Sequence, residues 1–191
     1  TPPRTIKEKN DTIANIIAAI TGRHRFLVLG HQSPDDDCIA SMVAFALVLR
    51  LFTRQAAIYF GAEPHGHFHY LLAICRFNGI RILLPGAPLT AGIEAVVACD
   101  TPKPAMIEAS EAVREVVARP GVLRIEIDHH FGADSGYFGD PGYRLVAEAS
   151  SSCELIGHLL MKLRNRKDLL ERFQVADLFP RNVVLAILTG I

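Results

Sequence analysis

Hydrophobic residues along the chain follow two spacings, one typical of helices and one typical of buried strands. Isoleucines recur at helical spacing in the first segment, and short apolar runs that stop at glycine or acidic residues are typical of strands. The predicted helices cover residues 5–21, 36–51, 67–78, 107–118, 151–163, 167–173 and 180–188. The predicted strands cover residues 26–29, 56–60, 80–84, 94–99 and 122–127, and a glycine-rich loop covers 132–142.

The alternation of strands and helices predicts an α/β fold, with a parallel sheet of about five strands flanked by helices on both faces. Three of the strands end at or just before a polar residue that can bind a metal ion, namely His31, Asp100 and Asp128. In parallel sheets, ligands bind beyond the carboxyl ends of the strands. We therefore expect these three positions to meet at one edge of the sheet.

The segment from His31 to Ser41 combines one imidazole with three carboxylates, those of Asp35, Asp36 and Asp37. Carboxylates this close repel one another in a medium of low dielectric constant, and a divalent cation among them removes that cost. Histidine and carboxylate ligands together suit Mn²⁺, with Mg²⁺ as the alternative. For this segment alone, a purely structural interpretation stays open, in which an acidic helix start lies beside a packed histidine.

Two further segments carry residues of the same chemical types. Asp100 follows an apolar strand, and by itself such a residue is more often a helix cap or a turn former. Asp128, His129 and His130 follow another strand. Adjacent side chains cannot both point the same way, so one histidine can bind metal while the other faces substrate. Asp128 can orient a ligand histidine through a hydrogen bond.

The charge balance of the chain narrows the class of substrate. The 191 residues include 20 Lys and Arg and 20 Asp and Glu, so the basic surplus that is typical of proteins binding long nucleic acid is missing. A small anionic substrate, such as a short oligonucleotide, a nucleotide or polyphosphate, is therefore favoured over a long duplex. The sequence is compatible with a homodimer.

The cysteines and the apolar runs indicate in which cellular compartment the protein is expected. The four cysteines are scattered without a Cys-x-x-Cys pair, which is typical of buried free thiols in a reducing compartment. The longest apolar run, residues 40–49, is shorter than the roughly 20 residues that span a bilayer. The N-terminal stretch has no apolar signal core. We therefore expect a soluble, cytoplasmic protein with no membrane partner.

Taken together, the motifs resemble those of the DHH phosphoesterase family. The matching stretches, in chain order, are His31-x-x-Pro34-Asp35-x-Asp37, Ala98-Cys99-Asp100-Thr101, Asp128-His129-His130, the serine-rich helix start Ser150–Glu154, and Gly190-Ile191, which looks like the opening of a fourth motif. The ordered set is far more specific than any one motif. Within the family, the nano-RNase and nucleoside bisphosphate phosphatase branch looks most similar.

The resemblance implies how two divalent cations would be held. His31 and Asp35 would bind one cation, and Asp37 and His129 would bind the other. Asp100 would bridge both.

Substrate contacts follow in part from the resemblance and in part from position. His130 would contact the substrate phosphate, with Asp128 beside it as the second catalytic residue. Ser151 and Ser152, in the serine-rich helix start, are candidates for binding the substrate. Arg144 lies between the third motif and this helix, and its charge makes it a further candidate for binding an anion.

The implied activity is hydrolysis of short oligonucleotides or small nucleotides, in which a water activated by two metal ions attacks phosphorus. Hydrolysis of inorganic pyrophosphate or polyphosphate is an alternative within the same family. A non-catalytic, nucleotide-binding scaffold is a third option, although degenerate copies usually lose ligands. The chain has neither a Gly-x-Ser-x-Gly elbow nor a P-loop, which argues against a serine hydrolase and a P-loop kinase.

The family also implies a further metal-binding aspartate soon after Ile191, and a C-terminal substrate-binding domain. Residues 1–191 are therefore expected to form a DHH catalytic domain that is cut within its fourth motif. On this interpretation, the segment lacks one ligand of the complete site.

Overall fold

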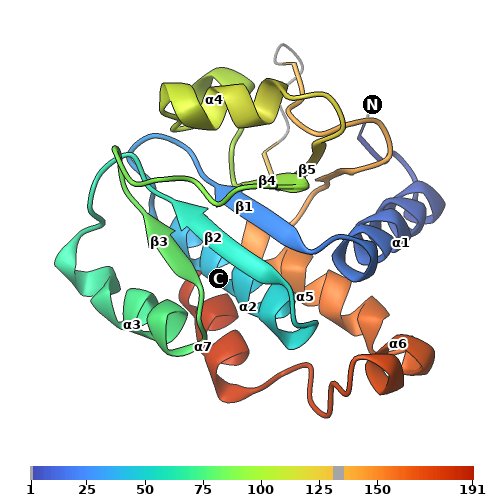
Figure 1. Ribbon diagram of the computed structural model, residues 1–191. Helices are drawn as coiled ribbons and strands as arrows, with labels where there is room; N and C mark the ends of the chain where they lie inside the picture. Colours follow the sequence, from blue (N-terminus) through green and yellow to red (C-terminus); the bar gives the residue numbers. More distant parts are fainter. Residues whose placement is uncertain (1, 131–135) are drawn as a thin grey trace.

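Six parallel strands form one sheet, in the order β3-β2-β1-β4-β5-β6, in the computed structural model, which describes residues 2–130 and 136–191. The strands are β1 (Arg25–Leu29), β2 (Gln55–Tyr59), β3 (Arg81–Leu83), β4 (Ala95–Cys99), β5 (Leu123–Asp128) and β6 (Arg144–Val146). The predicted parallel α/β sheet is confirmed (Figure 1). The sheet has one strand more than predicted, because the three residues of β6 are too few to show a strand periodicity.

Helices cover both faces of this sheet, as predicted. They are α1 (Ile6–Gly22), α2 (Asp36–Leu51), α3 (His69–Phe77), α4 (Glu111–Ala118), α5 (Ser152–Leu163), α6 (Lys167–Arg172) and α7 (Arg181–Thr189), with the 3₁₀ turns η1 (Gly66–Phe68) and η2 (Pro104–Met106). Helix α4 lies over one face, and α2, α5 and α7 lie over the other (Figure 1). Each face buries a hydrophobic core of its own, the larger one around α2.

Helix α2 is the central helix of the larger core. Every residue from Cys38 to Leu49 is buried, because the helix packs between the sheet and the pair α5 and α7. A helix that is apolar on all sides needs such burial on all sides. Its acidic residues are confined to the N-terminal end, where Asp35 is the N-cap and where free N–H groups and the helix dipole favour negative charge. Packing therefore holds an acidic helix start against the edge of the sheet.

Two predicted helices begin later than expected. The helix predicted from residue 107 begins at Glu111, with Ser110 as its cap. Ile107 instead forms an isolated antiparallel bridge with His31. The helix predicted over 67–78 is α3, which the 3₁₀ turn η1 precedes. Residues 132–135 of the predicted glycine-rich loop lie outside the described residues.

The strand order creates a switch point between β1 and β4. From β1 the chain moves outward through β2 and β3, and it returns to β4 on the other side of β1. Leu29 pairs with Ala98 and Cys99 pairs with Ile127, so β1, β4 and β5 end level with one another. Ligands in open parallel sheets bind at such a point, beyond the carboxyl ends of the strands. The topology thus brings three distant segments to one place.

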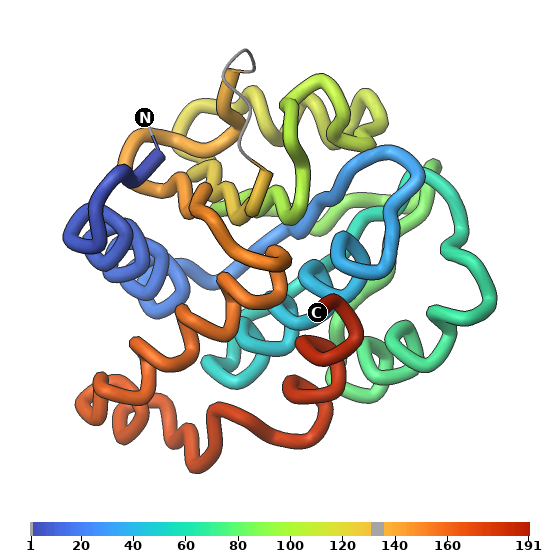
Figure 2. The backbone as a smooth tube through the Cα atoms, turned by 180° about the vertical axis from the view of Figure 1, so that it is seen from behind, coloured from blue at the N-terminus to red at the C-terminus, as the bar shows by residue number. Residues whose placement is uncertain are grey.

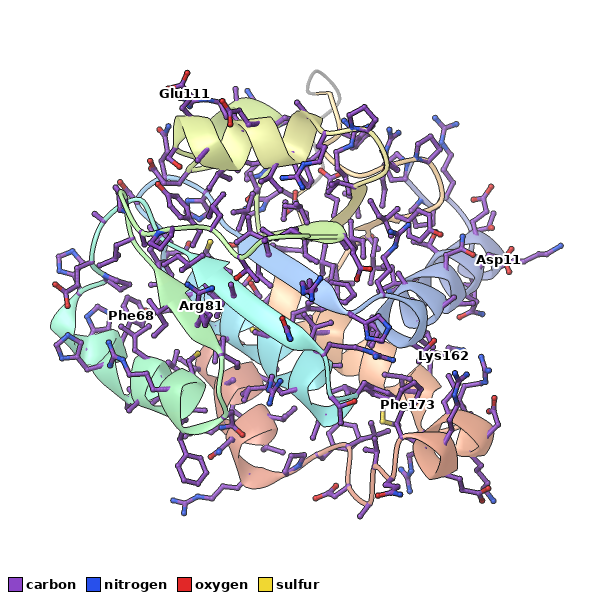
Figure 3. The ribbon with its side chains drawn as sticks, in the orientation of Figure 1. Asp11, Phe68, Arg81, Glu111, Lys162 and Phe173 are labelled. Carbon is purple, nitrogen blue, oxygen red and sulfur yellow. The ribbon has the colours of Figure 1, made fainter. Side chains whose placement is uncertain are left out.

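The outer surface and the interior follow the usual division between polar and apolar groups. Charged side chains such as those of Asp11, Glu111 and Lys162 extend outward from the helices (Figure 3). All four cysteines are buried free thiols. Among the described residues, no helix combines the length and the hydropathy that crossing a membrane requires.

Candidate metal centre

Side chains from three segments meet at the carboxyl edge of the sheet and form what we call the His/Asp cluster. Its members are His31, Asp35 and Asp37 between β1 and the first turn of α2, Asp100 after β4, and His129 and His130 after β5. Imidazole nitrogens and carboxylate oxygens in the cluster lie 3.4–3.9 Å apart. The predicted convergence of these segments is therefore confirmed.

Asp100 lies at the centre of the cluster, and its side chain is 1% exposed. Its Oδ2 is 3.8 Å from Nε2 of His31, and its Oδ1 is 3.4 Å from Nε2 of His129. The two oxygens of one carboxylate thus face histidines that follow two different strands. The φ angle of Asp100 is 51°, a left-handed value that aspartate tolerates better than most residues and that is frequent at functional sites.

His31 and His129 present the same ring nitrogen to the carboxylates. Nδ1 of His31 lies 2.7 Å from the carbonyl oxygen of Gln32, and Nδ1 of His129 lies 3.3 Å from that of Ala149. Because a carbonyl only accepts, each Nδ1 carries the proton, and each neutral ring has a lone pair on Nε2. These lone pairs face carboxylate oxygens. Such an arrangement is favourable only with a cation between the two groups, either a further ring proton or a metal ion.

His130 is oriented by Asp128 instead. Its Nδ1 lies 2.8 Å from Oδ1 of Asp128, which also accepts the backbone N–H of His130 at 3.2 Å. Burial opposes protonation, but the hydrogen bond to Asp128 and the charges of Asp100 and Asp35 outweigh it, so the pKa of His130 is raised. The ring is 43% exposed. With Nδ1 bonded to Asp128, Nε2 can donate to an anion that arrives from solvent.

The first turn of α5 holds Asp37 in place. The backbone N–H groups of Ser152 and Cys153 donate to its two oxygens at 2.7 and 3.0 Å. A helix N-terminus supplies such donors together with the positive end of its dipole. The hydroxyl of Ser152 donates to Oδ1 of Asp100 at 2.9 Å. Ser152 therefore connects two carboxylates of the cluster, and its side chain is fully buried.

Of the three consecutive aspartates, two face the cluster and one does not. Oδ1 of Asp35 accepts the N–H of Cys38 as the N-cap of α2 and lies 3.9 Å from Nε2 of His31. Asp36 is instead paired with Nε2 of His67, in the turn η1, at 3.5 Å. The structure therefore separates Asp36 from the two neighbours that resemble it in sequence.

Electrostatics at Asp100 indicate a place for positive charge. Burial and the charge of Asp37 raise the pKa of Asp100 from its ordinary 3.8 to about 7. A hydrogen bond from Ser152 lowers this pKa, and one shared with Asp37 raises it. Two carboxyl groups share a hydrogen bond only through a proton, which a bound cation would replace. Imidazole Nε2 atoms, together with carboxylates that need a shared positive charge, form a ligand set that fits divalent cations.

Within residues 2–130 and 136–191, two groups of potential ligand atoms are compact enough to hold a metal ion. His31, Cys38 and Asp100 form one, and Asp100, His129 and His130 form the other, with the atoms of each group within 4.8 Å of one another. Asp100 belongs to both groups. Cys38 was not predicted as a ligand, and its position directly after the acidic segment was the available signal. Burial raises the pKa of its thiol, so a protonated Cys38 is a weak ligand.

Arg144 and Ser151 lie outside the cluster. Arg144 is the first residue of β6, where its Nε donates to the carbonyl of Gly139 at 2.5 Å and its guanidinium lies over the ring of Tyr137. Ser151 caps α5, and its hydroxyl accepts the N–H of Glu154 at 3.0 Å. The contact of these residues with a substrate stays a prediction.

The end of α7 packs against the cluster. Figure 2 shows it beside the beginnings of α2 and α5. A Cβ atom at Gly190 would meet Sγ of Cys153 and Oδ1 of Asp37, so this close approach requires glycine. The predicted fourth motif at Gly190-Ile191 stays a prediction, and Gly190 lies beside Asp37.

Comparison with known proteins gives a family and a fold. The DHH family, N-terminal domain, matches residues 25–191. An exopolyphosphatase-related protein from Bacteroides fragilis has a similar structure, with 17% sequence identity and a TM-score of 0.62. That similarity covers 95% of this chain and 49% of the other, so the chain spans about half the length of that protein. No curated protein matches the chain. Because the family match covers most of the sequence and includes every member of the His/Asp cluster, the chain belongs to the DHH family.

Proposed function

We propose that this protein is a metal-dependent phosphoesterase that hydrolyses short oligonucleotides or small nucleotides at the His/Asp cluster. The observation that carries this proposal is the position of the Asp100 carboxylate, whose two oxygens face the Nε2 atoms of His31 and His129. A ligand that bridges two cations needs this arrangement. Membership of the DHH family supports the same assignment.

The ligands would divide between two divalent cations, with Mn²⁺ favoured and Mg²⁺ as the alternative. His31 and Asp35 would hold one, Asp37 and His129 would hold the other, and Asp100 would bridge them. When bound, such cations supply Lewis acidity, which lowers the pKa of water and withdraws charge from phosphoryl oxygens.

The remaining side chains would position the substrate and the ligands. His130, held by Asp128, would donate Nε2–H to a phosphate oxygen, where negative charge develops during hydrolysis. Its raised pKa favours the protonated form that this role needs. Ser152 would keep the Asp37 and Asp100 carboxylates in their orientations through the bonds that it donates to both. No side chain is required as a nucleophile.

Hydrolysis of inorganic pyrophosphate or polyphosphate is the second candidate function. One solved structure with this fold is described as exopolyphosphatase-related. The His/Asp cluster would serve both reactions, because in each a water attacks phosphorus and an oxygen leaving group departs. The two substrate classes differ in the base and sugar that only a nucleotide carries, so the surroundings of the cluster decide between them.

The direct test is an assay of the purified protein with Mn²⁺, on a dinucleotide and on pyrophosphate. We expect hydrolysis of the dinucleotide, its loss in chelator, and its return when Mn²⁺ is added back. Hydrolysis of pyrophosphate alone would replace the first function by the second. Binding of Mn²⁺ with no hydrolysis of either compound would favour a nucleotide-binding scaffold.

Two matched variants test the assignment of the bridging ligand. Asp100→Asn keeps the shape of the side chain but removes its charge, so Mn²⁺ binding and hydrolysis should both fall below detection. Asp36→Asn changes a carboxylate from the same acidic segment that pairs with His67, and it should keep both. Unchanged turnover in Asp100→Asn would falsify the bridging role.

A further inference from the structure

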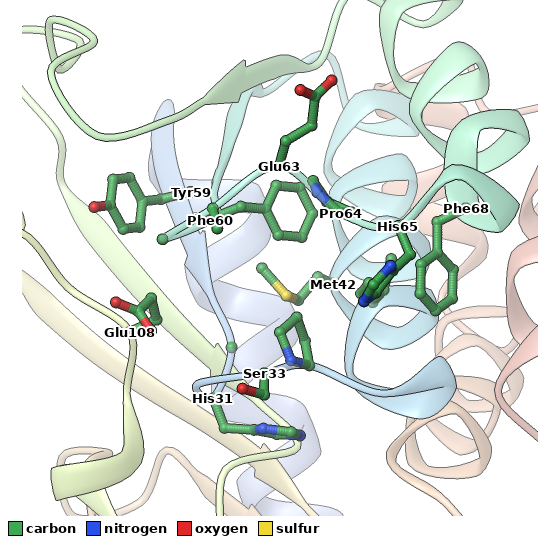
Figure 4. Close-up of a pocket in the computed structure, with 15 residues that line it drawn as sticks. His31, Ser33, Met42, Tyr59, Phe60, Glu63, Pro64, His65, Phe68 and Glu108 are labelled. Atoms are coloured by element: carbon green, nitrogen blue, oxygen red, sulfur yellow. The ribbon is translucent and has the colours of Figure 1, made fainter.

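A cavity of about 330 Å³ opens beside the His/Asp cluster (Figure 4). His31 contributes to its wall, and the other parts come from the start of α2, the loop after β2, the turn η1 and the segment before α4. Its volume lies within the roughly 300–1,000 Å³ that is typical of sites for small molecules. None of the roles proposed above for the cluster uses this cavity.

Apolar and aromatic side chains form much of the wall of the cavity, with polar residues such as Ser33, His65 and Glu63 among them. Met42, Phe60 and Phe68 line it, and each of these side chains is itself buried, with at most 3% exposed. Nucleobases stack on aromatic side chains, and apolar walls suit flat neutral rings. None of the described residues that line the cavity is Lys or Arg. A phosphate chain would therefore find no fixed positive charge here to replace its hydration.

Glu108 supplies the polar edge of the cavity and is tied to the cluster through the backbone. Its N–H donates to the carbonyl of Gly30 at 3.1 Å, and the N–H of Gln32 donates to that of Met106 at 2.8 Å. These bonds join the segment that carries Glu108 to the segment that carries His31. Among the described residues, no donor bonds or pairs with the Glu108 carboxylate. The backbone that carries this unpaired acceptor is therefore held against the segment that carries a proposed metal ligand.

Gly61 leaves the space that the side chain of Glu108 occupies. A Cβ atom at Gly61 would overlap Cγ, Cδ and Oε1 of Glu108. The φ angle of Gly61 is not in the positive region, so a side chain at this position would be resisted only by the Glu108 carboxyl group, which it would displace. In Figure 4, Glu108 lies across the cavity from Met42, whereas Glu63 extends away from the other labelled side chains.

We propose that this cavity binds the nucleobase of the substrate, with the Glu108 carboxylate accepting hydrogen bonds from N–H groups on the edge of the base. The assignment rests on the proposed function, and it favours nucleotides over inorganic polyphosphate. A carboxylate offers two acceptor oxygens. Guanine presents two neighbouring N–H donors on one edge, whereas adenine presents an amino group beside a ring acceptor. Guanine is therefore the expected base.

The test measures binding of nucleosides in chelator, so that neither metal nor hydrolysis contributes. Saturation-transfer NMR titrations should show guanosine binding about tenfold more tightly than adenosine, as expected for hydrogen bonds to a charged acceptor. Glu108→Gln keeps the size of the side chain but places an NH₂ group against the donors of guanine, and it should remove the preference. Glu115→Gln, on the exposed side of α4, is the matched control and should keep it.

Equal binding of the two nucleosides, or a guanosine preference that survives in Glu108→Gln, would overturn the proposal. Gly61→Ala is a second variant, because its Cβ displaces the Glu108 carboxyl group, and it should also weaken guanosine binding.

If the protein binds guanosine but hydrolyses no phosphoester with Mn²⁺, the proposed function fails and the base site stands. If it hydrolyses guanine and adenine dinucleotides with equal KM, and Glu108→Gln changes neither value, the base site fails and the proposed function stands.

Discussion

The hydroxyl of Ser152 donates a 2.9 Å hydrogen bond to Oδ1 of Asp100, across 52 positions of the sequence. Both side chains are buried. The bond opposes the effect of burial, because it lowers the pKa of Asp100 while desolvation raises it. The backbone N–H of the same serine donates to Asp37. One residue at the start of α5 therefore orients two carboxylates that come from two other segments.

Removing the hydroxyl of Ser152 should weaken metal binding. Ser152→Ala leaves Oδ1 of Asp100 without its donor, and loss of such an outer hydrogen bond typically lowers metal affinity by about 10- to 100-fold. Calorimetric titration with Mn²⁺ measures the change. Ser150→Ala is the control, because the Ser150 hydroxyl is exposed and bonds to Glu154 instead of the cluster. Equal affinities in the two variants would contradict the role of Ser152.

The two adjacent histidines should separate metal binding from turnover. His129→Ala removes an Nε2 lone pair that faces Asp37 and Asp100, so Mn²⁺ affinity should fall sharply. His130→Ala removes a donor for the phosphate, so kcat should fall by about 10²- to 10³-fold while Mn²⁺ affinity changes little. Titrations and steady-state kinetics on both variants test this division. Loss of Mn²⁺ binding in His130→Ala, as complete as in His129→Ala, would show that both rings are ligands.

Without metal, Asp100 should make stability depend on pH. The folded protein holds the Asp100 proton with a pKa of about 7, against 3.8 for the ordinary group. The resulting stabilisation is present in full below the lower pKa and is lost as the pH rises towards 7, at up to about 1.4 kcal/mol per pH unit. Urea unfolding in chelator, between about pH 5 and pH 8, should show a shallower dependence for Asp100→Asn than for the unchanged protein. Parallel curves would mean that Asp100 is not the group responsible.

Added Mn²⁺ should raise the thermal midpoint of the protein. Ions that bind only the folded state stabilise it by about 2.7 kcal/mol at a concentration of 100 times Kd. The increase should be larger at pH 8 than at pH 6, because protons on Asp100 compete with the cation. Differential scanning fluorimetry measures it. Asp36→Asn should show the full increase and Asp100→Asn little of it, and an equal increase in both would place the bound ion elsewhere.

Much of the framework around the cluster could be predicted from local sequence. The boundaries 36–51 predicted for α2 are those of the structure, because an acidic first turn precedes a long apolar run that ends at Leu51. The start of α4 and the existence of β6 could not be predicted in this way. Ile107 pairs with His31 instead of joining the helix, and β6 exists because it pairs with β5. Both depend on partners that are distant in sequence.

The family resemblance assigned ligand roles to Asp35 and Asp37 and left Asp36 out, but the residue types alone did not distinguish the three carboxylates. Asp35, Asp36 and Asp37 look alike in the sequence, and their directions depend on how α2 is rotated against the sheet. Packing of the apolar part of α2 determines that rotation. It places Asp37 at the first turn of α5 and Asp36 beside His67.

By itself, the sequence determined the α/β class and the three strand ends that meet at the site, because apolar runs and the polar residues that end them are local features. Tertiary structure alone decided which atom of each residue faces the centre. His31 and His129 present Nε2 because carbonyl groups occupy Nδ1, and for His129 that carbonyl belongs to Ala149, which is 20 positions away. The bond of His129 follows no periodicity in the sequence, because folding brings its two partners together from separate segments.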